Sequence, residues 1–172
     1  MKRYCITDSA EVAARAARDG VEMIQIRAKE LSGRALTELV KNVIAACGCS
    51  VLVNTRTDVA LACRARGVHL PSNSISPAKI RRIAPAGFLI GVSCHTIDEL
   101  KASEREGADF AVFGPVFPSV TKAGAPLGIE ALGMATKAVR LPVYALGGVT
   151  AENAPQCIQT GAAGIAGISL FA

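Results

Sequence analysis

The chain has 172 residues, enough for one domain with a sizeable core; 51% are hydrophobic, yet only 4% are aromatic and none is Trp. The formal net charge of +5 is dispersed, and its densest cluster, residues 79–82, has no aromatic neighbour, so we expect small anionic ligands and no nucleic-acid partner. No apolar run approaches the ~18 residues of a membrane span and no signal peptide is evident, so we expect a cytoplasmic protein with no membrane association and six reduced cysteines.

Short apolar runs alternate with helical patterns at intervals of roughly twenty residues along the chain. The eight predicted strands are Tyr4–Ile6, Met23–Ile26, Val51–Val53, Val68–Leu70, Phe88–Val92, Phe110–Phe113, Val143–Leu146 and Gly164–Ile168. This alternation predicts an α/β fold, a parallel (β/α)8 or TIM barrel, as a single domain over residues 1–172. An open flavodoxin-like sheet is the structural alternative.

Local signals predict where helices begin. Ser9 is placed as an N-cap, and Thr96 with Glu99 fits a capping box. We also expect Asp58 and Thr150 to cap the helices that follow them. Further helices are predicted over the apolar stripe 36–44, over Ile129–Val139 and over Ala151–Gln159.

The sequence ends at Ala172, directly after the eighth predicted strand, whereas barrels of this type usually have about 200 or more residues. We therefore expect a short version of the barrel that lacks most of the last helix. The missing helix would leave an apolar wall for a second copy of the chain to cover, which favours a homo-oligomer.

Three loops that follow predicted strands offer groups that bind phosphate. The loop after the sixth strand carries Ser119, Thr121 and Lys122, two hydroxyl donors and a compact cation. Glycines 147 and 148 after the seventh strand let backbone N–H groups approach a phosphate closely, and residues 168 and 169 follow the eighth. Because active sites of such barrels lie at the carboxyl ends of the strands, these loops should share one site.

The second strand ends in Gln25, Arg27 and Lys29, which strand alternation places on one side. Their convergence on a diphosphate is the favoured interpretation, because arginine can bind phosphate through two hydrogen bonds. A structural ion-pair network is the alternative. We expect His69 to be a hydrogen-bonded core residue, and the role of His95 stays open.

Several short motifs, read in order, match one known family over nearly the whole chain. They are Ile6-Thr-Asp8, Gln25-x-Arg27-x-Lys29, Asn54-x-Arg56-x-x-Val-Ala60, Gly67-Val-His-Leu70, Gly91-Val-Ser93, Phe113-Gly-Pro-Val-Phe-Pro-Ser-Val-Thr-Lys122 and Leu146-Gly-Gly-Val-x-x-x-Asn153. In these stretches the chain resembles the thiamine phosphate synthase family, which folds as a (β/α)8 barrel. Its members join hydroxymethylpyrimidine diphosphate to a thiazole phosphate and release diphosphate.

The resemblance implies a role for each matching position. Arg27, Lys29 and Lys122 would be the catalytic residues, which stabilise charge on the departing diphosphate. The substrate-binding positions would be Gln25 and Asn54 for the pyrimidine diphosphate, Ser93 beside the pyrimidine, and Ser119, Thr121, Gly147, Gly148, Ile168 and Ser169 for the thiazole phosphate.

The chain departs from the family at two positions. The resemblance implies Mg²⁺ held by two aspartates, and Thr55 and Ser74 stand at their places. Since Mg²⁺ favours anionic oxygen ligands, we expect the protein itself to hold the ion weakly if at all. A non-synthase relative that isomerises a thiazole phosphate, or a phosphate-ligand binding or regulatory module, is therefore the alternative to a synthase. The tautomerase branch of the family places a histidine where this chain has Pro115, so that site is not reproduced.

Overall fold

The computed structural model describes residues 1–118 and 125–171, and within them strands and helices alternate throughout. The strands are β1 (Lys2–Thr7), β2 (Met23–Ile26), β3 (Ser50–Asn54), β4 (Gly67–Leu70), β5 (Leu89–Cys94), β6 (Phe110–Phe113), β7 (Val143–Leu146) and β8 (Gly164–Gly167). The helices are α1 (Ala10–Arg18), α2 (Gly33–Ala46), α3 (Thr57–Ala62), α4 (Pro77–Arg81), α5 (Ile97–Arg105), α6 (Gly128–Ala138) and α7 (Ala154–Gln159).

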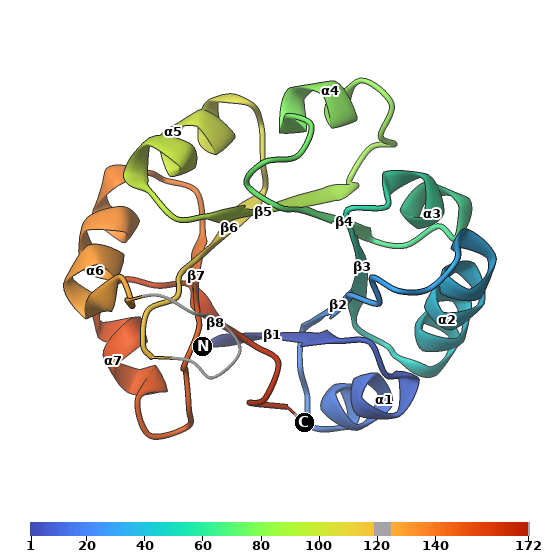
Figure 1. Ribbon diagram of the computed structural model, residues 1–172, viewed down its shortest axis with the longest axis horizontal. Helices are drawn as coiled ribbons and strands as arrows, with labels where there is room; N and C mark the ends of the chain where they lie inside the picture. Colours follow the sequence, from blue (N-terminus) through green and yellow to red (C-terminus); the bar gives the residue numbers. More distant parts are fainter. Residues whose placement is uncertain (119–124, 172) are drawn as a thin grey trace.

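The sheet closes on itself. Each strand pairs in parallel with its sequence neighbours, and β1 also pairs with β8, from Lys2 opposite Gly164 to Cys5 opposite Gly167. Viewed along the barrel, the strands form a ring and the helices lie outside it (Figure 1). The predicted TIM barrel is confirmed. The open-sheet alternative is wrong, because such a sheet would leave two unpaired edges.

Strand alternation divides the apolar side chains into two layers. One face of each strand packs against the helices, and the other fills the interior of the barrel. The interior cluster consists of Tyr4, Ile6, Met23, Leu52, Phe110, Val112, Tyr144 and Ala166. Among the described residues, this cluster fills the barrel interior below its mouth.

Two of the predicted helix caps are confirmed. The Ser9 hydroxyl accepts a hydrogen bond from the Val12 N–H at 3.3 Å, which satisfies a free donor at the start of α1. Thr96 and Glu99 form a reciprocal capping box before α5.

Of the other two predicted caps, the one at Asp58 is wrong and the one at Thr150 forms, although helix α7 begins later than predicted. Asp58 makes no capping bond; its carboxylate accepts hydrogen bonds from Arg56 Nε at 2.9 Å and Nη2 at 2.6 Å. Helix α7 begins at Ala154, not at 151, because the preceding residues form a turn. In that turn Thr150 Oγ1 accepts a hydrogen bond from the Asn153 N–H at 3.4 Å, and the Thr150 N–H donates to Asn153 Oδ1 at 2.8 Å.

The described residues after β8 form a turn and no helix, in accord with the expected short barrel. Leu170 and Phe171 pack against the outer core, and the Phe171 carbonyl accepts a hydrogen bond from Arg15 Nη2 at 3.2 Å, beside α1 (Figure 1). The outward side chain of β8, Ile165, is only 2% exposed. The chain itself therefore covers the expected apolar wall, which removes that argument for a homo-oligomer and leaves the oligomeric state a prediction.

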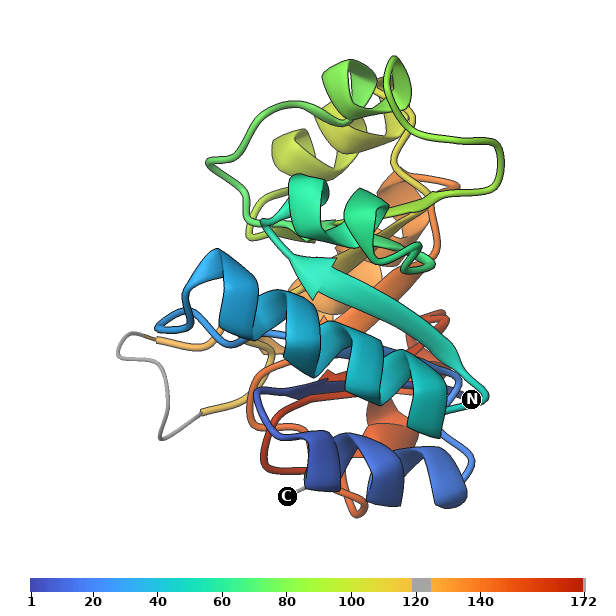
Figure 2. The same cartoon turned by 90° about the vertical axis from the view of Figure 1, so that its right-hand side faces the viewer.

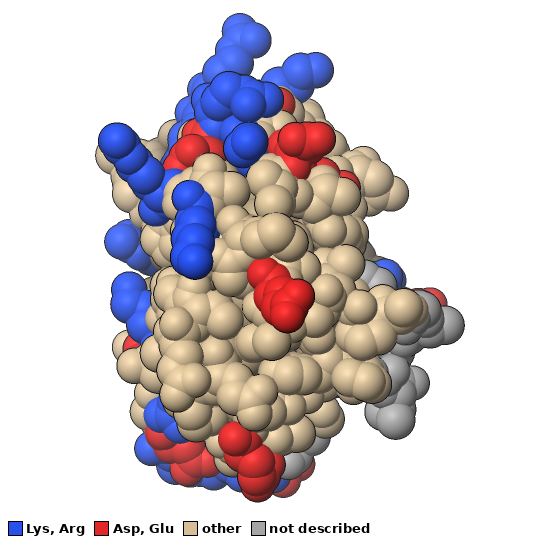
Figure 3. All heavy atoms as spheres, turned by 90° about the vertical axis from the view of Figure 1, so that its left-hand side faces the viewer, with Lys and Arg blue, Asp and Glu red and all other residues tan. Residues whose placement is uncertain are grey.

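Charges are unevenly spread over the outer surface. Figure 3 shows Lys and Arg side chains gathered over α4 and α5, and a broad face below them with few charges. None of the helices that the structure describes has the length and apolar character needed to cross a membrane.

Closure of the barrel can be tested at the seam between β1 and β8. A Cβ on Gly164 would lie 2.2 Å from the Lys2 carbonyl oxygen, which is backbone that cannot move without opening the pairing. We expect Gly164→Ala to lower the free energy of unfolding by about 2–3 kcal/mol, measured by urea denaturation. A Cβ on Gly48 would meet no atom within 4 Å, so Gly48→Ala is the matched control. Equal stability of the two variants would contradict the closed seam.

Candidate active site

A cavity of about 510 Å³ occupies the mouth of the barrel, at the carboxyl ends of the strands. Figure 2 shows the barrel from the side, with the β3 arrowhead pointing away from the N-terminus. Strand ends and the loops after them line the cavity together. The predicted site residues among them are Gln25, Arg27, Lys29, Asn54, Ser93, Gly147, Gly148, Ile168 and Ser169. The structure therefore brings together all the predicted substrate positions that it describes.

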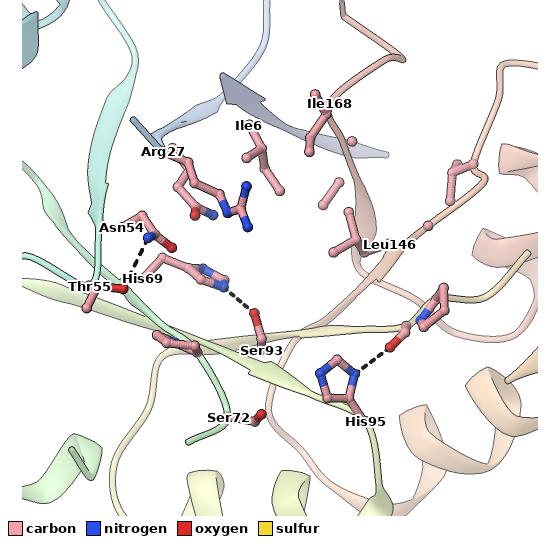
Figure 4. A pocket seen from close by; sticks show the side chains of 18 of the residues that line it. Ile6, Arg27, Asn54, Thr55, His69, Ser72, Ser93, His95, Leu146 and Ile168 are labelled. Atoms are coloured by element: carbon pink, nitrogen blue, oxygen red, sulfur yellow. Dashed lines mark hydrogen bonds between the residues drawn. The ribbon is translucent and has the colours of Figure 1, made fainter. Parts of the chain in front are cut away.

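The end of β2 supplies the positive charge of the cavity. Gln25 is 2% exposed, whereas Arg27 and Lys29 are exposed toward the mouth. The Arg27 N–H donates to the Thr7 carbonyl at 2.8 Å, which extends the β1–β2 pairing and fixes where the side chain departs. Neither cation forms an ion pair with any residue in the described ranges. The alternative of a structural ion-pair network is therefore not found in this part of the chain, and the charge remains directed at the cavity (Figure 4).

The turn after β3 holds a threonine in an unfavourable backbone conformation. Thr55 has a φ of 63°, in the left-handed region, which a β-branched residue rarely adopts. Two hydrogen bonds hold it there: its N–H donates to the His69 carbonyl at 2.8 Å, and Asn54 Nδ2 donates to its Oγ1 at 3.1 Å. Since Oγ1 accepts from Asn54, the Thr55 hydroxyl proton remains available to a ligand in the cavity.

His69 is a core residue with hydrogen bonds on both ring nitrogens, as predicted, but it also lines the cavity. Its Nδ1 lies 3.1 Å from the Tyr4 hydroxyl and its Nε2 lies 2.9 Å from Ser93 Oγ (Figure 4). Burial, with a smaller contribution from the nearby Arg27 charge, lowers the pKa of His69 to about 3. The ring is therefore neutral at physiological pH.

The other histidine has a different partner. His95 Nδ1 lies 2.6 Å from the Gly114 carbonyl oxygen, which can only accept, so Nδ1 carries the proton. In the neutral ring Nε2 is then the acceptor, at the edge of the cavity that His95 also lines.

The turn after β7 requires its two glycines. Gly147 and Gly148 have φ values of 93° and 62°. A Cβ on Gly147 would lie 2.5 Å from Pro115 Cβ, and one on Gly148 would lie 2.2 Å from the Pro118 carbonyl oxygen. Packing against the segment after β6 therefore requires glycine at both positions, and both glycines also line the cavity.

Some predicted positions lie elsewhere. Ser74 lines a smaller neighbouring cavity and not the mouth. Ser119, Thr121 and Lys122 lie outside the described residues. Ser72 and Asn73 line the mouth although sequence reasoning assigned them no role. The one sequence feature that could have indicated them is their position, since they follow β4 as Thr55 follows β3.

Comparison with known proteins agrees with this geometry. A family model described as thiamine monophosphate synthase matches residues 2–171. The chain is 40% identical to a putative thiamine-phosphate synthase 2 of Aquifex aeolicus, over 98% of this chain and 96% of that one. The chain belongs to the thiamine monophosphate synthase family. It is 44% identical to a thiamine-phosphate synthase of Chlorobium luteolum, over 95% of this chain and 79% of the relative.

A solved structure shows the same likeness within this family. A thiamine phosphate pyrophosphorylase from Pyrococcus furiosus superposes with a TM-score of 0.89 at 34% identity, over 98% of this chain and 85% of that one. The fold and the sequence therefore support the same family assignment.

Magnesium, which membership of this family implies, does not fit the side chains of the mouth. None of the described lining residues is Asp or Glu, whereas Arg27 and Lys29 are both among them. In the described ranges no three His, Cys, Asp or Glu residues group as metal ligands. Mg²⁺ prefers carboxylate oxygens and its own waters, whereas this cavity offers amides, hydroxyls and cations. The donor set suits an anion rather than a cation held by the protein.

Position 55 tests this conclusion. Because aspartate and asparagine tolerate the left-handed region better than threonine, we expect Thr55→Asp and Thr55→Asn to match or exceed the wild-type stability, by up to about 1 kcal/mol. Only Thr55→Asp adds a carboxylate, so it alone should make diphosphate bind at least ~10-fold more tightly with Mg²⁺ than with EDTA. Calorimetric titration of inorganic diphosphate measures this difference. An equally large Mg²⁺ effect in the wild-type protein would show that another group holds the metal.

Proposed function

We propose that this chain joins hydroxymethylpyrimidine diphosphate to a thiazole phosphate, yielding thiamine phosphate and diphosphate. The observation that carries the proposal is the pair of cations at the end of β2, which face the same cavity as the glycine turn after β7. A diphosphate and a phosphate ester are then bound at opposite walls of one mouth. Family membership supplies the reaction for which this arrangement is suited.

Arg27 and Lys29 act on the leaving group. When the bond between the pyrimidine methylene carbon and the diphosphate oxygen breaks, its electron pair goes to the oxygen, and negative charge grows on the diphosphate. Two cations that have no ion-pair partner among the described residues are already in place to stabilise that charge. The thiazole nitrogen then donates its lone pair to the electron-deficient methylene, which forms the new carbon–nitrogen bond. No residue of the chain is required to transfer a proton in this sequence.

The thiazole phosphate is assigned to the wall formed by the loops after β7 and β8. Gly147, Gly148 and Ser169 line the cavity there, and backbone N–H groups of such a turn can bind phosphate oxygens. Ser119 and Thr121 remain predicted hydroxyl donors for this phosphate, and Lys122 remains a predicted cation for the departing diphosphate. Gln25 and Asn54 are assigned to the pyrimidine diphosphate, and Ser93 to the pyrimidine ring. Any Mg²⁺ would be held by oxygens of the diphosphate rather than by carboxylates of this cavity.

Turnover of both substrates tests the proposal. We expect the purified chain, given hydroxymethylpyrimidine diphosphate, thiazole phosphate and magnesium, to form thiamine phosphate and diphosphate in equal amounts. Arg27→Ala should lower kcat/KM by about 100-fold or more, because it removes a charge that faces the leaving group. Arg27→Lys keeps the charge but loses the bidentate hydrogen bonding of the guanidinium, so its activity should be intermediate.

The matched control is Arg105→Ala, an exposed arginine in the last turn of α5, which should stay within about twofold of wild type. A folded wild-type protein that releases no diphosphate would refute the proposed reaction. An Arg27→Ala variant with wild-type turnover would refute only the role of that residue.

A further inference from the structure

A line of four polar side chains runs from the barrel interior to the mouth. Gln25 Nε2 lies 3.1 Å from the Tyr4 hydroxyl, which lies 3.1 Å from His69 Nδ1, and His69 Nε2 lies 2.9 Å from Ser93 Oγ. Tyr4, Gln25 and His69 are at most 3% exposed, whereas Ser93 is half-buried and lines the cavity. These residues come from β1, β2, β4 and β5, so the closed barrel is what assembles the line.

The chemistry of each group determines which atom donates and which accepts in each hydrogen bond of the line, that is, its direction. An amide nitrogen only donates, so the Tyr4 oxygen accepts from Gln25 and gives its own proton to its other partner, His69 Nδ1. An Nδ1 that accepts carries no proton, so in the neutral ring the proton is on Nε2, which donates to Ser93 Oγ. The Ser93 hydroxyl proton then has no acceptor among residues 1–118 and 125–171, and Ser93 lines the cavity.

The protonation states needed for this order are held by burial. The neutral state of His69 persists at physiological pH, because desolvation and the Arg27 charge both oppose a proton on the ring. Burial also raises the pKa of Tyr4, so its hydroxyl keeps the proton that it donates. The Tyr4 ring itself is fixed by edge contacts with Phe110 and Tyr144, at centroid distances of 5.4 and 6.2 Å.

We propose that Tyr4 and His69 are positioning residues that hold Ser93 as a hydrogen-bond donor to a ring nitrogen of the substrate. A donor fixed in this way selects a ligand atom with a lone pair, such as a pyrimidine nitrogen, over a C–H group of the same shape. The direction of the line follows from the protein alone. The identity of the ring rests on the proposed function.

The direction can be measured without any ligand. The chain has two histidines, and they are expected in opposite tautomers, since the Gly114 carbonyl requires the proton on Nδ1 of His95. In protein labelled with ¹⁵N-histidine, NMR at neutral pH should show one ring protonated at Nε2 and one at Nδ1. His95→Asn should remove the Nδ1-protonated ring from the spectrum. A His69 ring protonated at Nδ1, or at both nitrogens, would overturn the proposal.

The consequence of a fixed Ser93 donor, a preference for a ligand with a ring nitrogen, can be measured by ligand binding. Two pyridine analogues of hydroxymethylpyrimidine diphosphate, each with one ring nitrogen replaced by C–H, serve as probes in calorimetric titrations. Wild-type protein should bind one of the two analogues about tenfold more weakly than the pyrimidine, the value of one well-placed hydrogen bond. Ser93→Ala should abolish this preference. Tyr4→Phe should remove most of it, because His69 Nδ1 then no longer accepts a hydrogen bond from Tyr4. The ring can carry its proton on Nδ1 instead, so that Nε2 accepts the Ser93 hydroxyl proton.

The matched control is Tyr144→Phe, the same chemical change on a buried ring that packs against Tyr4 and lies outside the line. It should keep the preference for the pyrimidine. A folded Tyr4→Phe variant with the wild-type preference would overturn the positioning role. If wild-type protein binds neither the pyrimidine nor the analogues, the ligand assignment and the proposed function fail together, whereas the tautomer measurement still decides the donor role of Ser93.

Discussion

The parallel pairing of β1 with β8 is the constraint on which the rest of the structure depends. It turns a row of strands into a ring, so that residues from the second, seventh and eighth strands face one cavity. In an open sheet the cations after β2 and the glycine turn after β7 would not enclose a common ligand. At Gly164 the seam leaves no room for a side chain, since this residue lies directly against the Lys2 carbonyl. Closure also determines the interior, where Tyr4 from the first strand reaches His69 from the fourth.

Much of this arrangement could be predicted from the sequence, because it depends on local patterns. The eight apolar runs match the observed strands to within two residues at either end, since strand periodicity and the glycines between strands are local signals. The shared orientation of Gln25, Arg27 and Lys29 at the end of β2 could be predicted for the same reason. The partner of Asp58 could not, because a capping side chain can prefer another group: Arg56 binds the Asp58 carboxylate. The dual role of His69 depends on partners 65 and 24 residues away, which no local pattern shows.

The site combines two kinds of polar recognition that differ in their physics. At the outer wall, Arg27 and Lys29 provide charge in a partly solvated mouth, which suits an anion that must bind and then leave. Deeper in the barrel, a neutral line of buried hydrogen bonds provides direction rather than charge, and burial makes an unpaired member costly. The two meet at His69, which Arg27 helps to keep neutral. A cavity without carboxylates among its described residues can therefore hold an anionic leaving group and still orient a neutral ring.

The central claim is that one mouth binds both halves of the product. A crystal structure of the protein with thiamine phosphate and inorganic diphosphate tests it most directly. We expect the pyrimidine ring against Ser93, the diphosphate against Arg27 and Lys29, and the thiazole phosphate against the turn of Gly147 and Gly148. Thiamine phosphate bound outside the barrel mouth, or bound with its phosphate on Arg27 and its pyrimidine away from Ser93, would contradict it.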